Sequence, residues 1–215
     1  DEWKWEDMTT LTDIEIYNCP YLEKLPTDML KSLPELISLN VAHNTSISDE
    51  QLKSDWEEII GDDSKCADKI QLLYMGYNKL KEFPAYDLLK KMKKLTLLDC
   101  TNNEIETLHP FGNEVRLMKV YLDNNNITEI PGVEEENGLK YFFGWNDLET
   151  FSCTNNQLTE VPNIFNAKSD YVMGTVDFSN NLIDKFEDGE EHRGINASTV
   201  NLHHNKFTVF PKLLY

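Results

Sequence analysis

The sequence predicts an α/β solenoid of about eight stacked repeats, with a parallel β-sheet on its concave side and short helices and irregular turns on its convex side. Three observations support this fold. An Asn or Cys recurs eight times, at intervals of 22 to 34 residues. Apolar residues lie eight, five and three positions before each of them. Most units add two further apolar residues after it, often followed by proline. Each unit therefore supplies one short strand whose apolar side chains can be buried only by stacking units.

The recurring polar residue ends each predicted strand. Its amide can both donate and accept hydrogen bonds, so it can pair with the bare backbone of the turn and of the neighbouring unit. A small, polarisable Cys replaces Asn in the first unit. We call these positions the ladder residues: Cys19, Asn44, Asn78, Asn103, Asn125, Asn156, Asn181 and Asn205.

The elements outside the strands follow in order. Residues 1–10 are expected to cap the N-terminal end, because Trp3 and Trp5 alternate as in a strand. The repeat domain then spans 11–215, with a short convex helix near 27–32. A first insertion covers about 48–69 and begins with a capping box at Ser48, followed by apolar residues at helical spacing. This predicts a convex helix whose Trp56 packs on the solenoid. A similar helix is expected near 85–93.

A second insertion covers about 132–147 and carries four aromatic side chains within five positions. They either fill the wider gap left by a 31-residue unit or form a recognition surface for apolar side chains or sugar faces. We call this cluster the aromatic insertion: Tyr141, Phe142, Phe143 and Trp145.

The pattern resembles the leucine-rich-repeat superfamily over about residues 11–211. The phrases at 125–131 and 156–162 resemble those of bacterial members, among them secreted or surface proteins of gut bacteria. The resemblance implies a right-handed horseshoe that recognises protein or glycan, and it offers no catalytic residues to carry over.

The outward residues of the predicted sheet form an acidic, amide-rich surface with several tyrosines. Such a surface suits hydrogen bonding around rigid aromatic anchors, although these residues can also be ordinary solvated strand positions. The central cluster is our candidate ligand-binding site on the concave face: Tyr74, Tyr77, Asp99, Tyr121 and Asp123.

The composition excludes several partners. A net charge of −18 argues against nucleic acid and against anionic membrane surfaces, because both attract clustered Lys and Arg. The charge is compatible with a cationic ligand, and its simplest role is solubility. The sequence contains no run of 18 apolar residues, so we expect no direct membrane insertion.

The sequence gives little support for catalysis or metal binding. We expect the four cysteines to be reduced core residues, with no metal site and no cofactor, because no C-x-x-C or paired-His spacing is present. Asp99 and Asp177 should lie about 14 Å apart by strand spacing, too far for a glycosidase pair. We therefore expect no enzyme activity.

The sequence favours a non-catalytic module that recognises a protein or peptide, or a glycan, as part of a secreted or surface-exposed bacterial protein. Two alternatives stay open: a structural subunit of a larger surface complex, and the targeting domain of a longer protein. The chain begins at Asp1 without an initiator Met, so an upstream signal or lipid anchor is compatible with it, and so is a cytoplasmic location. Since no closing helix follows Asn205, we expect a neighbouring domain or subunit to cover the C-terminal end.

Overall fold

One eight-stranded parallel sheet runs the length of the molecule. The computed structural model describes residues 4–82, 89–109, 115–131, 147–162, 172–186 and 195–209, together with the backbone of 133–134 and 140–141. The strands of the sheet are β1 (Asp13–Glu15), β2 (Ser38–Asn40), β3 (Leu72–Tyr74), β4 (Leu97–Asp99), β5 (Lys119–Tyr121), β8 (Thr150–Ser152), β10 (Met173–Asp177) and β12 (Ala197–Asn201). They pair in that order, so each repeat lies beside the repeat that precedes it in the sequence.

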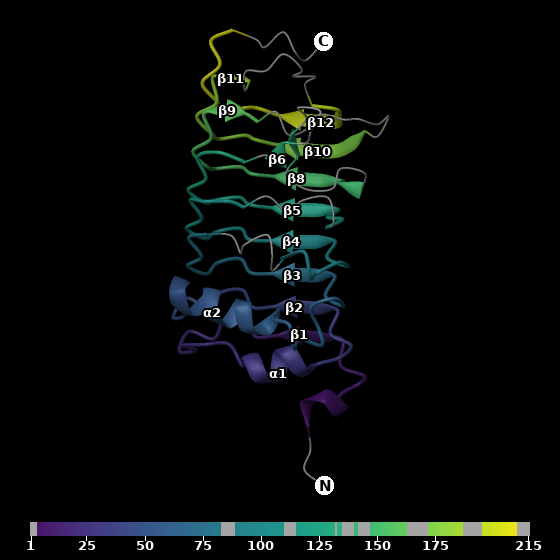
Figure 1. Cartoon of the computed structure of the whole chain (residues 1–215). Coiled ribbons are helices and arrows are strands. Elements are labelled where there is room, and N and C mark those ends of the chain that lie inside the picture. Colours follow the sequence, from purple (N-terminus) through teal and green to yellow (C-terminus); the bar gives the residue numbers. More distant parts are fainter. Residues whose placement is uncertain are drawn as a thin grey trace.

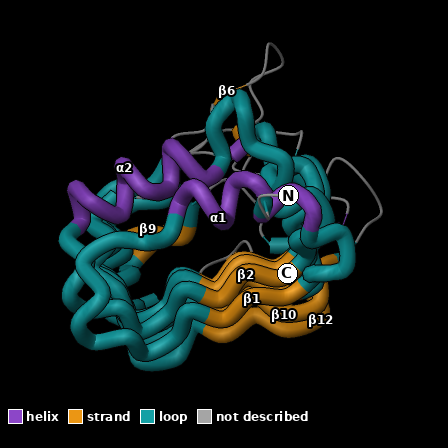
Figure 2. Tube along the Cα trace, turned by 90° about the horizontal axis from the view of Figure 1, so that it is seen from below, coloured by secondary structure: helices purple, strands orange, loops and turns teal. Residues whose placement is uncertain are grey.

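The repeats stack along one axis, as Figure 1 shows from the purple first unit to the yellow last one. The view along that axis in Figure 2 places the strands on one side. Helices α1 (Thr27–Ser32) and α2 (Asp49–Ile59) lie across the interior on the opposite side. The solenoid, its parallel sheet and its convex helices in the first units agree with the fold predicted from the repeat.

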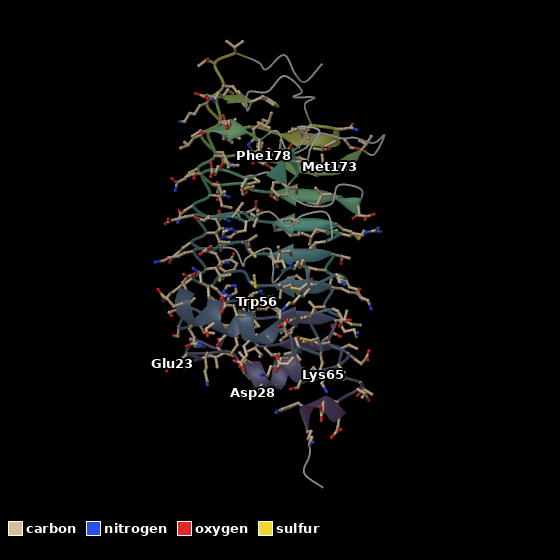
Figure 3. All side chains as sticks on the ribbon, in the orientation of Figure 1. Glu23, Asp28, Trp56, Lys65, Met173 and Phe178 are labelled. Atoms are coloured by element: carbon tan, nitrogen blue, oxygen red, sulfur yellow. The ribbon has the colours of Figure 1, made fainter. Side chains whose placement is uncertain are left out.

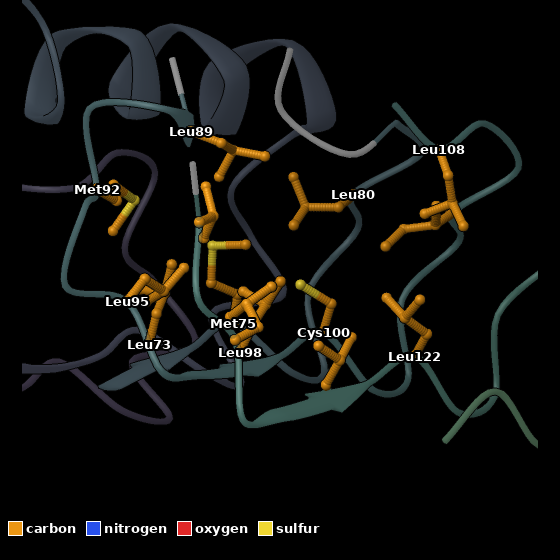
Figure 4. Close-up of a cluster of buried hydrophobic side chains, with 14 of the residues drawn as sticks. Leu73, Met75, Leu80, Leu89, Met92, Leu95, Leu98, Cys100, Leu108 and Leu122 are labelled. Atoms are coloured by element: carbon orange, nitrogen blue, oxygen red, sulfur yellow. The ribbon is translucent and has the colours of Figure 1, made fainter. Parts of the chain in front are cut away.

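The core is a column of inward side chains. One inward residue in each of the six inner strands, at the same register position, is fully buried, with an exposed fraction of 0%: Leu39, Leu73, Leu98, Val120, Phe151 and Val176. Figure 4 shows part of this column, where the strand residues Leu73 and Leu98 belong to one cluster with Leu89 and Met92 from the segment between β3 and β4. The corresponding Ile14 and Val200 at the two ends are only half-buried. Stacking of units therefore supplies the burial, as expected for a solenoid.

Helix α2 occupies the first half of the predicted insertion at 48–69. Ser48 caps it, because its hydroxyl accepts a hydrogen bond from Gln51 N at 3.2 Å. Gln51 donates its own side-chain amide to Asp55 at 2.7 Å, an alternative to the reciprocal bond of a complete capping box. Trp56, labelled in Figure 3, packs inward and is 4% exposed.

Two buried carboxylates tie α2 to units on both sides. Asp55 Oδ2 accepts a hydrogen bond from Leu25 N of the first unit at 2.7 Å. Asp49 Oδ1 accepts one from Lys81 N of the third unit, also at 2.7 Å. The helix belongs to the second unit, so it bridges three consecutive repeats.

The later convex segments are extended. Strands β9 (Glu160–Val161) and β11 (Lys185–Phe186) pair in parallel between two units. Backbone bonds also link units directly, for example from Leu182 N to Leu158 O at 2.9 Å. These bonds form a second hydrogen-bonded row behind the sheet.

The ladder residues lie where the strand ends, and all but the first and last are buried. Asn125 is representative: its amide donates to Cys100 O and Leu122 O at 3.0 Å, and its Oδ1 accepts from Ile105 N at 3.0 Å. One side chain thus satisfies backbone groups of two units.

The N-terminal segment departs from expectation. Trp5–Asp7 form a short 3-10 helix, η1, so the predicted capping strand is wrong at this point. Trp5 is 39% exposed, and Met8 instead packs against the first repeat. In this turn Asp7 N and Met8 N donate to Lys4 O and Trp5 O at 3.1 Å, so the backbone bonds locally and not to a neighbouring strand. Trp3 lies outside the described residues.

Three other predictions fall wholly or partly outside the described residues. Residues 85–88 of the helix expected near 85–93 do so, and so does the chain beyond 209 that the predicted C-terminal partner would cover. In the second insertion, the backbone forms an antiparallel pair of β6 (Val133–Glu134) and β7 (Lys140–Tyr141).

All four cysteines are free thiols. Cys100 and Cys153 occupy buried inward positions just after β4 and β8. Burial raises the pKa of both thiols well above the ordinary value, so they stay protonated and unreactive at neutral pH.

Candidate binding surface on the concave face

The sheet brings three of the predicted concave residues together. Tyr74, Asp99 and Tyr121 are direct register partners on β3, β4 and β5. All three are half-buried. The residue that precedes each of them in its strand is buried in the core, and side chains alternate along a strand, so these three point to the outward face. A tyrosine therefore stands on each side of one carboxylate at the centre of the concave face.

A row of apolar residues beside this trio escaped the sequence prediction. Leu72 and Leu97 are register partners at outward strand positions, and both are half-buried. Lys119 continues the same row on β5. The signal was present in the sequence, since Leu72 and Leu97 lie two positions before Tyr74 and Asp99 and so point to the same face of the sheet.

The two predicted carboxylates also have structural roles. Asp99 Oδ1 accepts a hydrogen bond from Thr101 N at 2.9 Å. Asp123 Oδ1 accepts from Ser152 Oγ at 2.6 Å and from Thr154 N at 2.7 Å. Each carboxylate thereby orders the turn that follows a strand, in its own unit or in the next.

The turn after each strand contains a residue with left-handed backbone. The residue before every ladder residue has a φ between 51° and 59°. Five of these eight residues are Asn, which tolerates this conformation well. The left-handed backbone explains why asparagine so often precedes the ladder residue. Tyr77, a predicted binding residue, occupies one of these positions.

Tyr77 lies in the turn after β3, at the border of the concave face. Its ring stacks on His43 of the preceding unit, with centroids 4.0 Å apart and planes at 14°. Tyr17 of the first unit meets the same His43 ring edge-on, at 4.9 Å and 67°. The sequence prediction did not include Tyr17 and His43, because the contact depends on how successive units align.

The concave face carries more negative than positive charge. Its outward strand and turn positions, all within the described residues, carry one lysine, Lys119, against five carboxylates: Asp13, Glu15, Asp99, Asp123 and Asp177. Asp99 and Asp177 are separated by β5 and β8, so they cannot act as a close carboxylate pair.

The aromatic insertion stays a prediction. Phe142, Phe143 and Trp145 lie outside the described residues, and only the backbone of Tyr141 is described. Within the described part of the chain, no helix is long and apolar enough to cross a bilayer. The same part holds no cluster of three or more His, Cys, Asp or Glu side chains suited to a metal ion.

No protein-family model matches the chain. The structure is similar to a leucine-rich repeat protein from Bacteroides eggerthii, with a TM-score of 0.86 and 45% identity over 99% of this chain and 34% of that one. A leucine-rich repeat protein from Bacteroides thetaiotaomicron gives a TM-score of 0.85 and 45% identity, over 100% of this chain and 25% of that one.

Among curated proteins, human lumican is 28% identical over 183 residues, which cover 79% of this chain and 52% of lumican. The chain thus spans about half of that relative's length, and a third or less of the two Bacteroides proteins. The repeated ladder, the parallel sheet and these similarities agree, and the chain belongs to the leucine-rich-repeat superfamily.

Proposed function

We propose that this chain is a non-catalytic recognition module that binds a protein or peptide through its concave face. Leucine-rich-repeat proteins generally mediate protein–protein interaction, and their sheets form extended binding surfaces. The observation that carries the proposal is the central patch, where Tyr74, Asp99 and Tyr121 stand beside Leu72 and Leu97 on adjacent strands.

The chemistry of this patch is typical of a protein interface. Two tyrosines supply rigid aromatic area with a hydroxyl at the tip, and two leucines supply apolar area. The surrounding carboxylates and amides provide a polar rim. Half-buried leucines at outward strand positions do little for the core of the solenoid, so a partner that covers them would gain their remaining apolar surface.

We further propose that the module belongs to a secreted or surface-exposed bacterial protein. The two Bacteroides proteins, at 45% identity, support the bacterial source. A second candidate role is the targeting domain of a longer protein, because the similar region makes up only 34% and 25% of those two proteins. In either role the concave face is the part that recognises the partner.

A comparative pull-down from the native cell envelope tests the binding site. The bait proteins are the unaltered chain, a Tyr74→Ala/Tyr121→Ala double variant, and a Tyr21→Ala control. Tyr21 suits the control because it is 93% exposed and lies outside the outward sheet positions. We expect one partner to be captured by the unaltered chain and the control but lost by the double variant.

The free energy of unfolding of the double variant should lie within about 1 kcal/mol of that of the unaltered chain, since truncating surface side chains costs little stability. Equal capture by all three baits would refute binding through the central patch. That result would favour binding through the aromatic insertion, or the alternative role of a structural subunit within a larger surface complex.

A further inference from the structure

The eight left-handed turn positions contain one residue that is costly there. Asn and His, which tolerate positive φ better than most residues, occupy seven of them, and Tyr77 occupies the eighth with a φ of 55°. A bulky side chain in this conformation is strained by about 1 kcal/mol or more. Asn102 in the next unit shows that the turn forms equally well with a small residue. The ring of Tyr77 therefore needs a reason beyond the local backbone.

The ring belongs to an aromatic stack that joins three consecutive units: Tyr17, His43 and Tyr77. We call it the Tyr–His–Tyr stack. Its contacts are the edge-on meeting of Tyr17 with His43 and the parallel stacking of His43 with Tyr77. Mutual packing does not hide the rings, since Tyr17 is 49% exposed and Tyr77 is 46% exposed.

One face of Tyr77 is directed away from the stack. His43 covers the face toward the second unit. Because the two rings are nearly parallel, the opposite face of Tyr77 is turned toward the side of the fourth unit, where the equivalent position holds the shorter Asn102. Tyr77 is 46% exposed, so we infer that a flat group lying over the asparagine can stack on the tyrosine ring.

The charge around the stack favours a cation. In the first four units, the outward strand positions and the turn positions up to each ladder residue are all described, and they carry Asp13, Glu15 and Asp99 but no lysine or arginine; the exposed Lys79 lies just past the ladder. A guanidinium group stacks on aromatic faces and still directs its N–H donors sideways to carboxylates. The stack and its neighbours offer both features.

We propose that the Tyr–His–Tyr stack binds an arginine side chain from a basic segment of the partner protein. This rests on the proposed function and names the chemistry of the partner. The bound guanidinium lies on the free face of Tyr77, over Asn102. The acidic concave face then attracts the rest of the basic segment toward the central patch.

The probe is an acetylated and amidated hexapeptide of alternating glycine and arginine, with a citrulline counterpart as its uncharged match. Binding is followed by NMR, from the shifts of the His43 and Tyr77 amides and of the histidine ring protons. Tyr77→Asn is the informative variant, because Asn suits the left-handed turn and leaves the net charge at −18. His204→Asn is the matched control, a change at the equivalent turn of the last described unit.

We expect Tyr77→Asn to bind the arginine peptide about 3- to 30-fold more weakly, the range of a cation–π contact. Its midpoint of thermal unfolding should stay within a few degrees of the unaltered protein. His204→Asn should bind as the unaltered protein does, and the citrulline peptide should bind more weakly than the arginine peptide throughout.

Equal affinity of all variants for the arginine peptide would overturn the proposal, because it would reduce binding to the general attraction of an acidic protein. Equal affinity for the citrulline peptide would also overturn it. A native partner that is lost by the Tyr74→Ala/Tyr121→Ala variant but kept by Tyr77→Asn would leave the proposed function standing while rejecting the stack as its arginine site.

Discussion

The first two units and the later units satisfy the backbone of the convex side in different ways. In the first two, helices α1 and α2 bond internally and α2 reaches its neighbours through Asp49 and Asp55. From the third unit on, extended segments pass backbone bonds directly from unit to unit, as between Glu104 N and Leu80 O at 2.9 Å. A helix has few free donors on its sides, so its unit needs side chains to make the connection.

The ladder residues record the same change. Asn44 Oδ1 accepts from the N–H of the preceding ladder residue, Cys19, at 3.0 Å, and Asn78 accepts from Asn44 at 2.8 Å. From Asn103 onward the donor is instead the residue two positions past the ladder, such as Leu80, at 3.1 Å. In the later units the residue two positions past the ladder is apolar and largely buried, so its N–H also points inward. In the first two units this position holds the exposed Tyr21 and Ser46. The same amide thus serves two turn geometries.

Removing a carboxylate of α2 should give the largest effect. Asp55→Ala leaves Leu25 N and the Gln51 amide without their acceptor in a site where Asp55 is 3% exposed. Because unpaired buried donors are costly, we expect the free energy of unfolding to fall by about 2–4 kcal/mol, measured by urea denaturation. Glu57→Ala, on the exposed side of the same helix, should change it by less than about 0.5 kcal/mol. Similar losses in both variants would contradict the bridging role of α2.

Removing a ladder amide in the extended region should have a somewhat smaller effect. Asn125→Ala leaves two carbonyls and the Ile105 N–H without their hydrogen-bond partner, so we expect the free energy of unfolding to fall by about 1–3 kcal/mol. The adjacent Asn126→Ala is the control, because the Asn126 side chain accepts an exposed bond from Gln157 at 3.3 Å and is not a ladder residue. A neutral Asn125→Ala would mean that the extended units do not depend on the ladder.

The smallest effect should come from the boundary between the two regions. The Glu82 carboxylate accepts from Lys53 Nζ of α2 at 2.8 Å and lies 2.5 Å from His109 Nε2 of the fourth unit. The hydrogen bond from Lys53, and then that from His109, lowers the pKa of Glu82 below its ordinary value of 4.5. A lowered folded-state pKa stabilises the protein above the unfolded-state pKa, and this stabilisation is lost as the pH falls through the folded-state value.

Glu82→Gln should therefore be less stable than the unaltered chain at pH 7, and the gap should close as the pH is lowered below about 4.5. Lys53 and Glu82 are both substantially exposed, so we expect the two proteins to differ in free energy of unfolding by no more than about 1 kcal/mol. The difference is measured by thermal unfolding at a series of pH values from 7 to 3. A gap that persists unchanged at pH 3 would show that the carboxylate charge does not stabilise this boundary.

Several features of the binding surface could be read from the sequence. The outward direction of Tyr74, Asp99 and Tyr121 follows from the strand period alone, and their proximity follows from the equal offset of each from its ladder residue. The leucine pair beside them, Leu72 and Leu97, obeys the same rule, so its direction also follows from the sequence. Whether these side chains bind a partner stays a prediction.

The sequence by itself determined the repeat, the parallel sheet, the inward column and the positions of α1 and α2, because these depend on the local direction of side chains and on capping. Only the tertiary structure decided that Asp55 reaches Leu25, that Asp123 orders the turn of the next unit, and that Tyr17, His43 and Tyr77 stack. Such contacts join residues 30 or more positions apart, or rings in separate units, and their geometry depends on how units of unequal length align. Periodicity specifies which way a side chain points, whereas packing between units specifies what it meets.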